Sequence, residues 1–127
     1  MRTNRILIVD DEDDIRALMQ SALERRGFEV VAVSSGAEAI AYLARDTPSI
    51  ILLDLEMDDG SGWTVLSALP KHPGFKTMKV IVVSGLQATV PSWAGFIRKP
   101  FRIDALMEHL GTATPAAAPE RLKSSAG

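Results

Sequence analysis

Two aliphatic runs of this chain end in aspartate. Residues 6–9 read ILIV and are followed by Asp10 and Asp11, and residues 51–53 read ILL and are followed by Asp54. Such runs are typical of buried strands, where a carboxylate is costly unless it is paired, protonated or bound to a metal ion. Two strands that both end in acid therefore predict one shared site.

The expected site favours a divalent metal ion. Asp10, Asp11 and Asp54 would repel one another within a few ångströms, and a hard cation neutralises such a cluster. Mg²⁺ prefers a few carboxylate or carbonyl oxygens completed by water and phosphate, whereas Ca²⁺ takes more protein oxygens. The sequence therefore predicts Mg²⁺ as the cofactor.

Two other expected strand ends carry groups with phosphate chemistry. Ser84 follows VIVV at residues 80–83, and Lys99 follows FIR at residues 96–98. A carboxylate nucleophile, a metal ion, a hydroxyl and an ammonium are the components of phosphoryl transfer. Taken singly, each side chain is also explained as a helix cap, a turn residue or a solvated charge. Their occurrence together favours the shared site.

The elements that must position these groups alternate along the chain. Strand-like runs are followed by apolar residues at helical spacing, with Gly27, Pro70 and Gly111 as stop signals and Ser35 with Glu38 as a capping pair. This alternation predicts an α/β protein with a doubly wound, five-stranded parallel sheet in three layers and strand order 2-1-3-4-5. The expected strands cover residues 6–9, 28–33, 49–53, 79–83 and 95–98.

The composition excludes several classes of function. The 127 residues fit one domain, and 14 basic against 16 acidic residues give a formal charge of -2, which argues against nucleic-acid binding by this chain. The chain contains no cysteine, and no apolar run approaches the roughly 20 residues of a membrane span. We therefore expect a cytoplasmic protein without a membrane partner.

At its strand ends the sequence resembles the receiver domains of two-component response regulators, over roughly residues 4–111. The resemblance rests on four fragments in the right order: VDDED, LLDLEM, VVSG and KPF. It implies a flavodoxin-like receiver fold, as residues 1–111. Residues 112–127 are rich in Ala, Pro and Ser and have no pattern that could build a further element, so we expect a disordered tail there. It also implies a phosphoacceptor signalling domain, which is not a conventional enzyme.

The resemblance implies a role for each acidic residue. Asp54 corresponds to the aspartate that takes a phosphoryl group from a histidine kinase or a phosphotransfer protein. Asp11 and Asp54 correspond to direct carboxylate ligands of Mg²⁺. Asp10 would act on the ion through water, and the backbone carbonyl of Glu56 would complete the protein ligands.

The remaining family positions fall on the last two strands. Ser84 would hold a phosphoryl oxygen and shift on activation, Lys99 would pair with the phosphate, and Phe96 stands where the family has an aromatic switch residue. Receivers commonly carry a cis bond after this lysine, and an X-Pro bond adopts cis at a cost of only ~0.5–1 kcal/mol. We therefore expect Lys99-Pro100 to be cis.

Two departures from the family pattern affect partner recognition. Asp58 replaces the usual proline four residues after the phosphoacceptor, and only residues 85–94 join the last two strands. A parallel crossover with its helix needs at least ~10–12 residues. We therefore expect at most about one turn of helix in this segment, where family members have a full helix.

Three functions follow as hypotheses. The first is a single-domain response regulator that is phosphorylated on Asp54 and acts on a downstream protein. The second is a Mg²⁺-dependent phosphohydrolase with an aspartyl nucleophile, because residues 11–13 have D-x-D spacing; against it, Ile15 replaces the expected threonine and no capping domain is present. The third is an interaction domain that keeps the receiver fold without using phosphate.

Overall fold

The computed structural model describes residues 4–85 and 88–112, with side-chain surroundings to residue 110. The chain forms five strands, four α-helices and two short 3-10 helices within these ranges. The strands are β1 (Arg5–Val9), β2 (Glu29–Val33), β3 (Ile50–Asp54), β4 (Lys79–Ser84) and β5 (Ala94–Arg98). The helices are α1 (Asp13–Arg25), α2 (Gly36–Leu43), α3 (Ser61–Ala68), η1 (Leu69–Lys71), η2 (Phe75–Thr77) and α4 (Ile103–Thr112).

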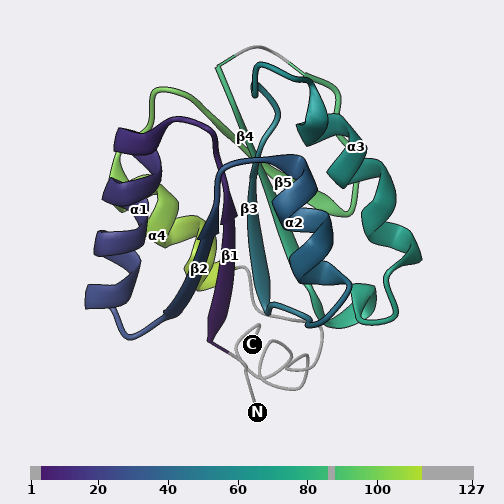
Figure 1. The fold of residues 1–127 in the computed structure, drawn as a ribbon. Helices are drawn as coiled ribbons and strands as arrows, with labels where there is room; N and C mark the ends of the chain where they lie inside the picture. Colours follow the sequence, from purple (N-terminus) through teal and green to yellow (C-terminus); the bar gives the residue numbers. More distant parts are fainter. Residues whose placement is uncertain (1–3, 86–87, 113–127) are drawn as a thin grey trace.

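All strand pairs are parallel, and the strand order is β2-β1-β3-β4-β5. The predicted fold class and strand order are therefore confirmed. Figure 1 shows α1 and α4 on one face of the sheet and α2 and α3 on the other. This arrangement explains the continuous aliphatic runs, because the central strands are buried on both faces.

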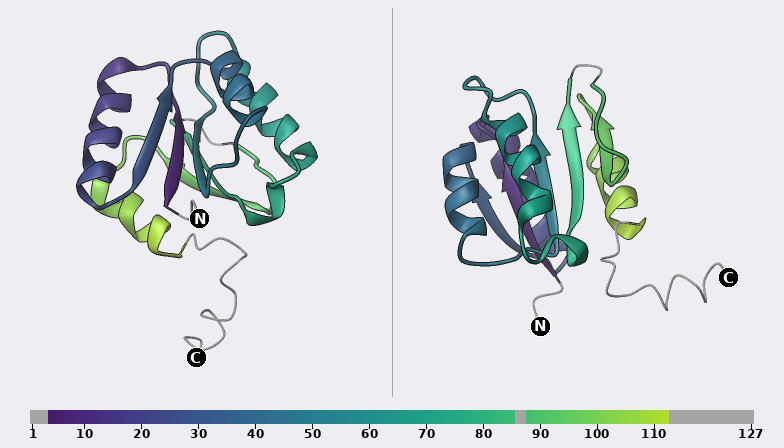
Figure 2. Two further views of the ribbon diagram at one scale, coloured as in Figure 1. Left: turned by 60° about the horizontal axis from the view of Figure 1, so that its bottom comes forward. Right: turned by 90° about the vertical axis from the view of Figure 1, so that its right-hand side faces the viewer.

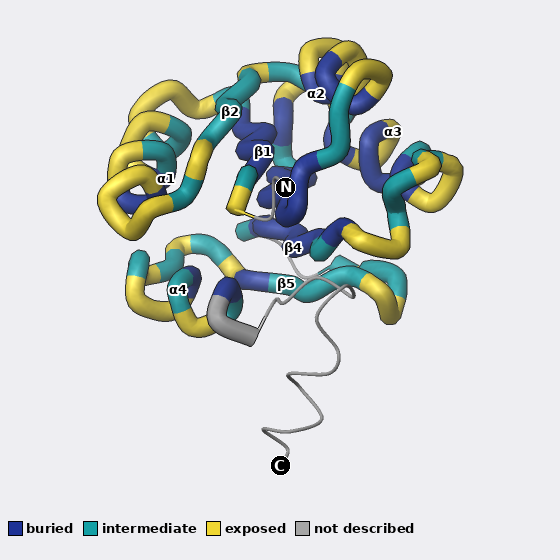
Figure 3. Tube along the Cα trace, turned by 90° about the horizontal axis from the view of Figure 1, so that it is seen from below, coloured by how far each residue is buried: buried dark blue, intermediate teal, exposed yellow. Residues whose placement is uncertain are grey.

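Alternate residues of each strand enter two separate cores. Ile6 and Ile8 of β1 pack with residues of α1 and α4, whereas Leu7 and Val9 pack with residues of α2 and α3. Figure 3 shows the buried strands at the centre and the exposed outer faces of the helices around them. Because successive side chains of a strand point to opposite faces of the sheet, each aliphatic run contributes to the core beneath both helix layers.

Some element boundaries differ from the sequence expectation. The third helix ends at Ala68, and Pro70 lies in the 3-10 helix η1 that continues from it. Proline lacks the N–H that an α-helix interior requires but fits the first turn of a helix. The last helix continues past the expected stop at Gly111 to Thr112. The rest of the expected tail lies outside the described residues.

The connection between β4 and β5 contains no helix in its described part, residues 85 and 88–93. This part of the chain agrees with the expectation of at most about one turn of helix, and Figure 2 shows the connection from two further directions. Ala88 and Val90 pack against the core on the α2 and α3 side, and the Trp93 ring meets Phe75 edge-on at 4.9 Å. These apolar contacts cover the sheet where a helix would otherwise lie.

None of the helices in the described ranges combines the length and the apolar composition needed to cross a bilayer.

Candidate functional site

The site begins with two buried aspartates on neighbouring strands. Val9 pairs with Leu53, so Asp10 directly after β1 and Asp54 at the end of β3 meet at the carboxyl edge of the sheet. Asp10 is 1% exposed and Asp54 is 2% exposed. The strand order reverses between β1 and β3, which is where ligands bind in doubly wound sheets.

Each aspartate is held in the same way by the residue two positions later. The N–H of Glu12 donates to Oδ1 of Asp10, and the N–H of Glu56 donates to Oδ1 of Asp54, both at 2.8 Å. The second oxygen of each carboxylate lies near Lys99. These backbone contacts orient two carboxylates toward a common point without using any other side chain.

Lys99 is the positive partner of the cluster. Its Nζ lies 3.1 Å from Asp54 Oδ2, 3.0 Å from Glu12 Oε1 and 3.8 Å from Asp10 Oδ2. Burial lowers the pKa of Lys99, but its hydrogen bond to Glu12 and the charges of Asp10 and Asp54 together outweigh burial and raise the pKa above its usual value. Lys99 is therefore a fixed cation at this site.

The peptide bond that follows Lys99 is cis, as the sequence predicts. The backbone N–H of Lys99 donates to the Ser84 carbonyl at 2.8 Å, which ties β5 to the end of β4. Ser84 is 2% exposed and lies at the same sheet edge as Asp54, whose register partner is Val83. The structure thus brings all four sequence-predicted strand ends to one edge.

The structure adds Glu12, which the sequence pattern does not single out. Asp10, Glu12 and Asp54 each offer an oxygen, and these three atoms lie within 4.8 Å of one another. Asp11 is not in this group, and its Oδ2 accepts a hydrogen bond from the Asp58 N–H at 3.0 Å. Its expected role as a direct metal ligand stays a prediction.

The donor set fits a hard divalent cation. All three groups are carboxylates, and Asp10 Oδ2 is buried without a hydrogen-bond partner. A buried oxygen without a hydrogen-bond partner is rare in proteins, so Asp10 Oδ2, with only the Lys99 ammonium at 3.8 Å, is suited to accept a cation as a ligand. Oxygen ligands of this kind suit Mg²⁺.

Glycine at position 62 allows α3 to pack closely against the acceptor strand. A Cβ atom at Gly62 would lie 2.4 Å from the Asp54 carbonyl oxygen and 2.9 Å from the Leu55 Cα. Both contacts are with backbone, which cannot move aside without displacing Asp54. Gly62 is therefore part of what fixes the position of this carboxylate.

The buried Asp10 carboxyl also makes folding stability depend on pH. Burial raises its pKa from 3.8 to about 6; the Glu12 N–H opposes this shift and the Asp54 charge adds to it. Because the folded state favours the protonated acid, protonated Asp10 contributes to the free energy of unfolding. This contribution is complete below the unfolded pKa and is lost as the pH rises through about 6.

We therefore expect Asp10→Asn to stabilise the metal-free protein at about pH 7.5 by roughly 1–3 kcal/mol, and much less near pH 4. The amide keeps an oxygen for the Glu12 N–H but cannot ionise. Urea unfolding in the presence of a chelator at both pH values measures the difference, with the exposed Asp58→Asn as control. An equal gain at both pH values would contradict the assignment of the effect to ionised Asp10.

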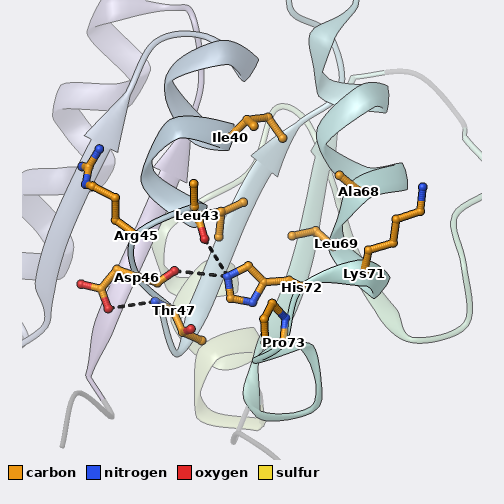
Figure 4. A pocket seen from close by; sticks show the side chains of 11 residues that line it. Ile40, Leu43, Arg45, Asp46, Thr47, Ala68, Leu69, Lys71, His72 and Pro73 are labelled. Carbon is orange, nitrogen blue, oxygen red and sulfur yellow. Dashed lines mark hydrogen bonds between the residues drawn. The ribbon is translucent and has the colours of Figure 1, made fainter.

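A second concave region lies at the opposite edge of the sheet and has a structural explanation. This pocket of ≈ 490 Å³ is formed by the ends of α2 and α3 and by η1 (Figure 4). His72 Nε2 lies 2.8 Å from the Leu43 carbonyl oxygen, and the Gly74 N–H donates to His72 Nδ1 at 2.8 Å. His72 Nε2 therefore joins the α3–β4 connection to the end of α2, and Nδ1 accepts within its own connection. The acidic cluster remains the candidate site.

The fold and the site together define a class of protein: a doubly wound α/β domain with an acidic, lysine-containing site at the carboxyl edge of its sheet. The chain matches the response regulator receiver domain family over residues 6–111 and belongs to that family. The expected family membership is confirmed.

Two relatives of this chain are regulatory proteins. The chain is 33% identical over 115 residues to the transcriptional regulatory protein KdpE of Mycobacterium tuberculosis, covering 85% of this chain and 50% of KdpE. It is 31% identical over 108 residues to the regulatory protein AtoC of Escherichia coli, covering 81% of this chain and 23% of AtoC. The chain thus spans half or less of these relatives.

Solved structures agree with the fold. The response regulator TrrA of Thermotoga maritima, in complex with Mg²⁺-BeF, is 30% identical, has a TM-score of 0.75, and is matched over 87% of this chain and 98% of TrrA. A CheY-like receiver domain protein of Methanospirillum hungatei is 29% identical, has a TM-score of 0.76, and is matched over 86% of this chain and 91% of that protein.

Proposed function

We propose that this receiver domain accepts a phosphoryl group on the Asp54 carboxylate from a histidine kinase or a phosphotransfer protein. The proposal rests on the surroundings of the Asp54 side chain. It is buried, its Oδ1 accepts from the Glu56 N–H, and its Oδ2 is paired with Lys99. A carboxylate fixed in this way beside a cation is suited to in-line attack on phosphorus.

In the proposed reaction one Asp54 oxygen forms a bond to phosphorus while the bond between phosphorus and the donor breaks. The donor leaves with the electron pair of the broken bond. Lys99 would balance the charge of the phosphoryl oxygens, and Ser84 would donate its hydroxyl to one of them. The family supplies the precedent for a phosphoacceptor signalling domain that is not a conventional enzyme.

We assign Mg²⁺ to Asp10, Asp11 and Asp54 with the Glu56 carbonyl, and Glu12 adds a further carboxylate at the rim of the site. The orphaned Asp10 oxygen supports this assignment, and the related TrrA structure contains Mg²⁺-BeF. When bound, the ion would supply positive charge to the transferring phosphoryl group. We further propose that the receiver passes its signal through protein contacts, consistent with its net charge of -2.

Incubation with acetyl phosphate tests the proposal. We expect one phosphoryl group per chain by intact mass with Mg²⁺ present and none with a chelator. The adduct should be acid-stable and base-labile. Catalytic turnover of a simple phosphate ester such as p-nitrophenyl phosphate, without a stoichiometric adduct, would instead support the phosphohydrolase. A chain that takes no label under any condition would support the phosphate-independent interaction domain.

A further inference from the structure

Glu56 connects the proposed phosphoacceptor to the end of the neighbouring strand. Its backbone N–H donates to Asp54 Oδ1 at 2.8 Å. Its side-chain Oε1 accepts a hydrogen bond from the Gly85 N–H, also at 2.8 Å. One residue therefore touches both Asp54 and the residue that follows Ser84.

Gly85 is held from two sides at the start of the connection between β4 and β5. Arg98 Nε donates to the Gly85 carbonyl at 3.0 Å, opposite the bond from Glu56. A Cβ atom at Gly85 would lie 3.0 Å from Glu56 Oε1 and 3.3 Å from Oε2. The absence of a side chain at Gly85 thus permits the close approach of the Glu56 carboxylate.

The negative charge of Glu56 would oppose phosphorylation of Asp54, because both groups lie at the same edge of the sheet. A phosphoryl group on Asp54 adds negative charge and strong hydrogen-bond acceptors. Like charges at short range repel, and both anions would compete for the same small set of donors. The Lys99 ammonium is already shared by Asp54, Glu12 and Asp10.

We propose that the Glu56 carboxylate is a resting-state latch on the Gly85 amide, and that this latch and a phosphoryl group on Asp54 exclude each other. The inference rests on the proposed function of Asp54. Glu56 acts as a positioning residue: it fixes the turn after Ser84 in the unphosphorylated protein and slows the arrival of the phosphoryl group. When the latch opens, Gly85, the first residue of the β4–β5 connection, loses its bond to Glu56. Phosphorylation of Asp54 would in this way be coupled to the start of the connection.

Two substitutions separate the hydrogen bond from the charge. Glu56→Gln keeps an oxygen that accepts from the Gly85 N–H but removes the charge, whereas Glu56→Ala removes both. Asp59→Asn, an exposed acid in the same loop, controls for net charge. In unphosphorylated, metal-free protein we expect Gly85 amide exchange to be slow in the wild type and in Glu56→Gln, and about tenfold faster in Glu56→Ala.

Initial rates of labelling by acetyl phosphate then test whether the charge of Glu56 slows phosphorylation. We expect both Glu56→Gln and Glu56→Ala to be labelled about fivefold faster than the wild type, with Asp59→Asn close to the wild type. Equal Gly85 exchange in the wild type and Glu56→Ala would overturn the latch, as would equal labelling rates in all four proteins. Absence of label in the wild type would overturn the proposed function, whereas the exchange measurement tests the hydrogen bond without phosphorylation.

Discussion

Asp54→Asn is expected to abolish labelling by acetyl phosphate, while the wild type takes up one phosphoryl group per chain. The substitution keeps the size of the side chain and an oxygen for the Glu56 N–H. It removes the carboxylate that would attack phosphorus, so the loss should be complete rather than partial. Intact mass after incubation with Mg²⁺ measures the result.

The matched control is Asp59→Asn, which makes the same chemical change at an exposed position in the loop after Asp54. This variant should be labelled to the same stoichiometry as the wild type. If Asp54→Asn were labelled as fully as Asp59→Asn, the phosphoacceptor would have to be another side chain.

Replacing Lys99 by methionine is expected to lower the free energy of unfolding of the metal-free protein by about 3 kcal/mol, because removing one partner leaves buried charges unpaired. Asp10 and Asp54 are almost fully buried, and Lys99 is the cation that the structure places beside both. Methionine keeps most of the apolar stem, so the expected loss reflects the charge.

Urea unfolding in the presence of a chelator measures this loss, with the exposed Lys76→Met as the matched control. Saturating Mg²⁺ should recover part of the stability of Lys99→Met, because a ligand that binds only the folded state stabilises it. A loss no larger than that of Lys76→Met would show that Lys99 does not compensate the buried carboxylates.

The sheet and the placement of the site were predictable because both follow from local patterns. Aliphatic runs with helical spacing between them define the strands and helices, and the carboxyl ends of parallel strands share one edge. Asp10, Asp54, Ser84 and Lys99 each stand at such an end, so their gathering needs only the strand order.

The details of the site depend on contacts between distant segments. Glu12 enters the cluster because Lys99, 87 positions away in sequence, bonds to its carboxylate. The Asp11 carboxylate accepts from Asp58 across two loops, and Glu56 reaches Gly85 on another strand end. Loop side chains have no periodic pattern that fixes their direction, so these three contacts could not be derived from spacing.

Locating the adduct in the wild-type protein shows whether Asp54 takes the phosphoryl group. Borohydride converts an aspartyl phosphate to homoserine, which marks the modified position for peptide sequencing by mass spectrometry. We expect homoserine at position 54 alone in protein treated with acetyl phosphate and Mg²⁺, and none when a chelator is present. Homoserine at Asp11 or Asp58, 5-hydroxynorvaline at Glu12, or the same conversion of Asp54 without Mg²⁺ would contradict this assignment.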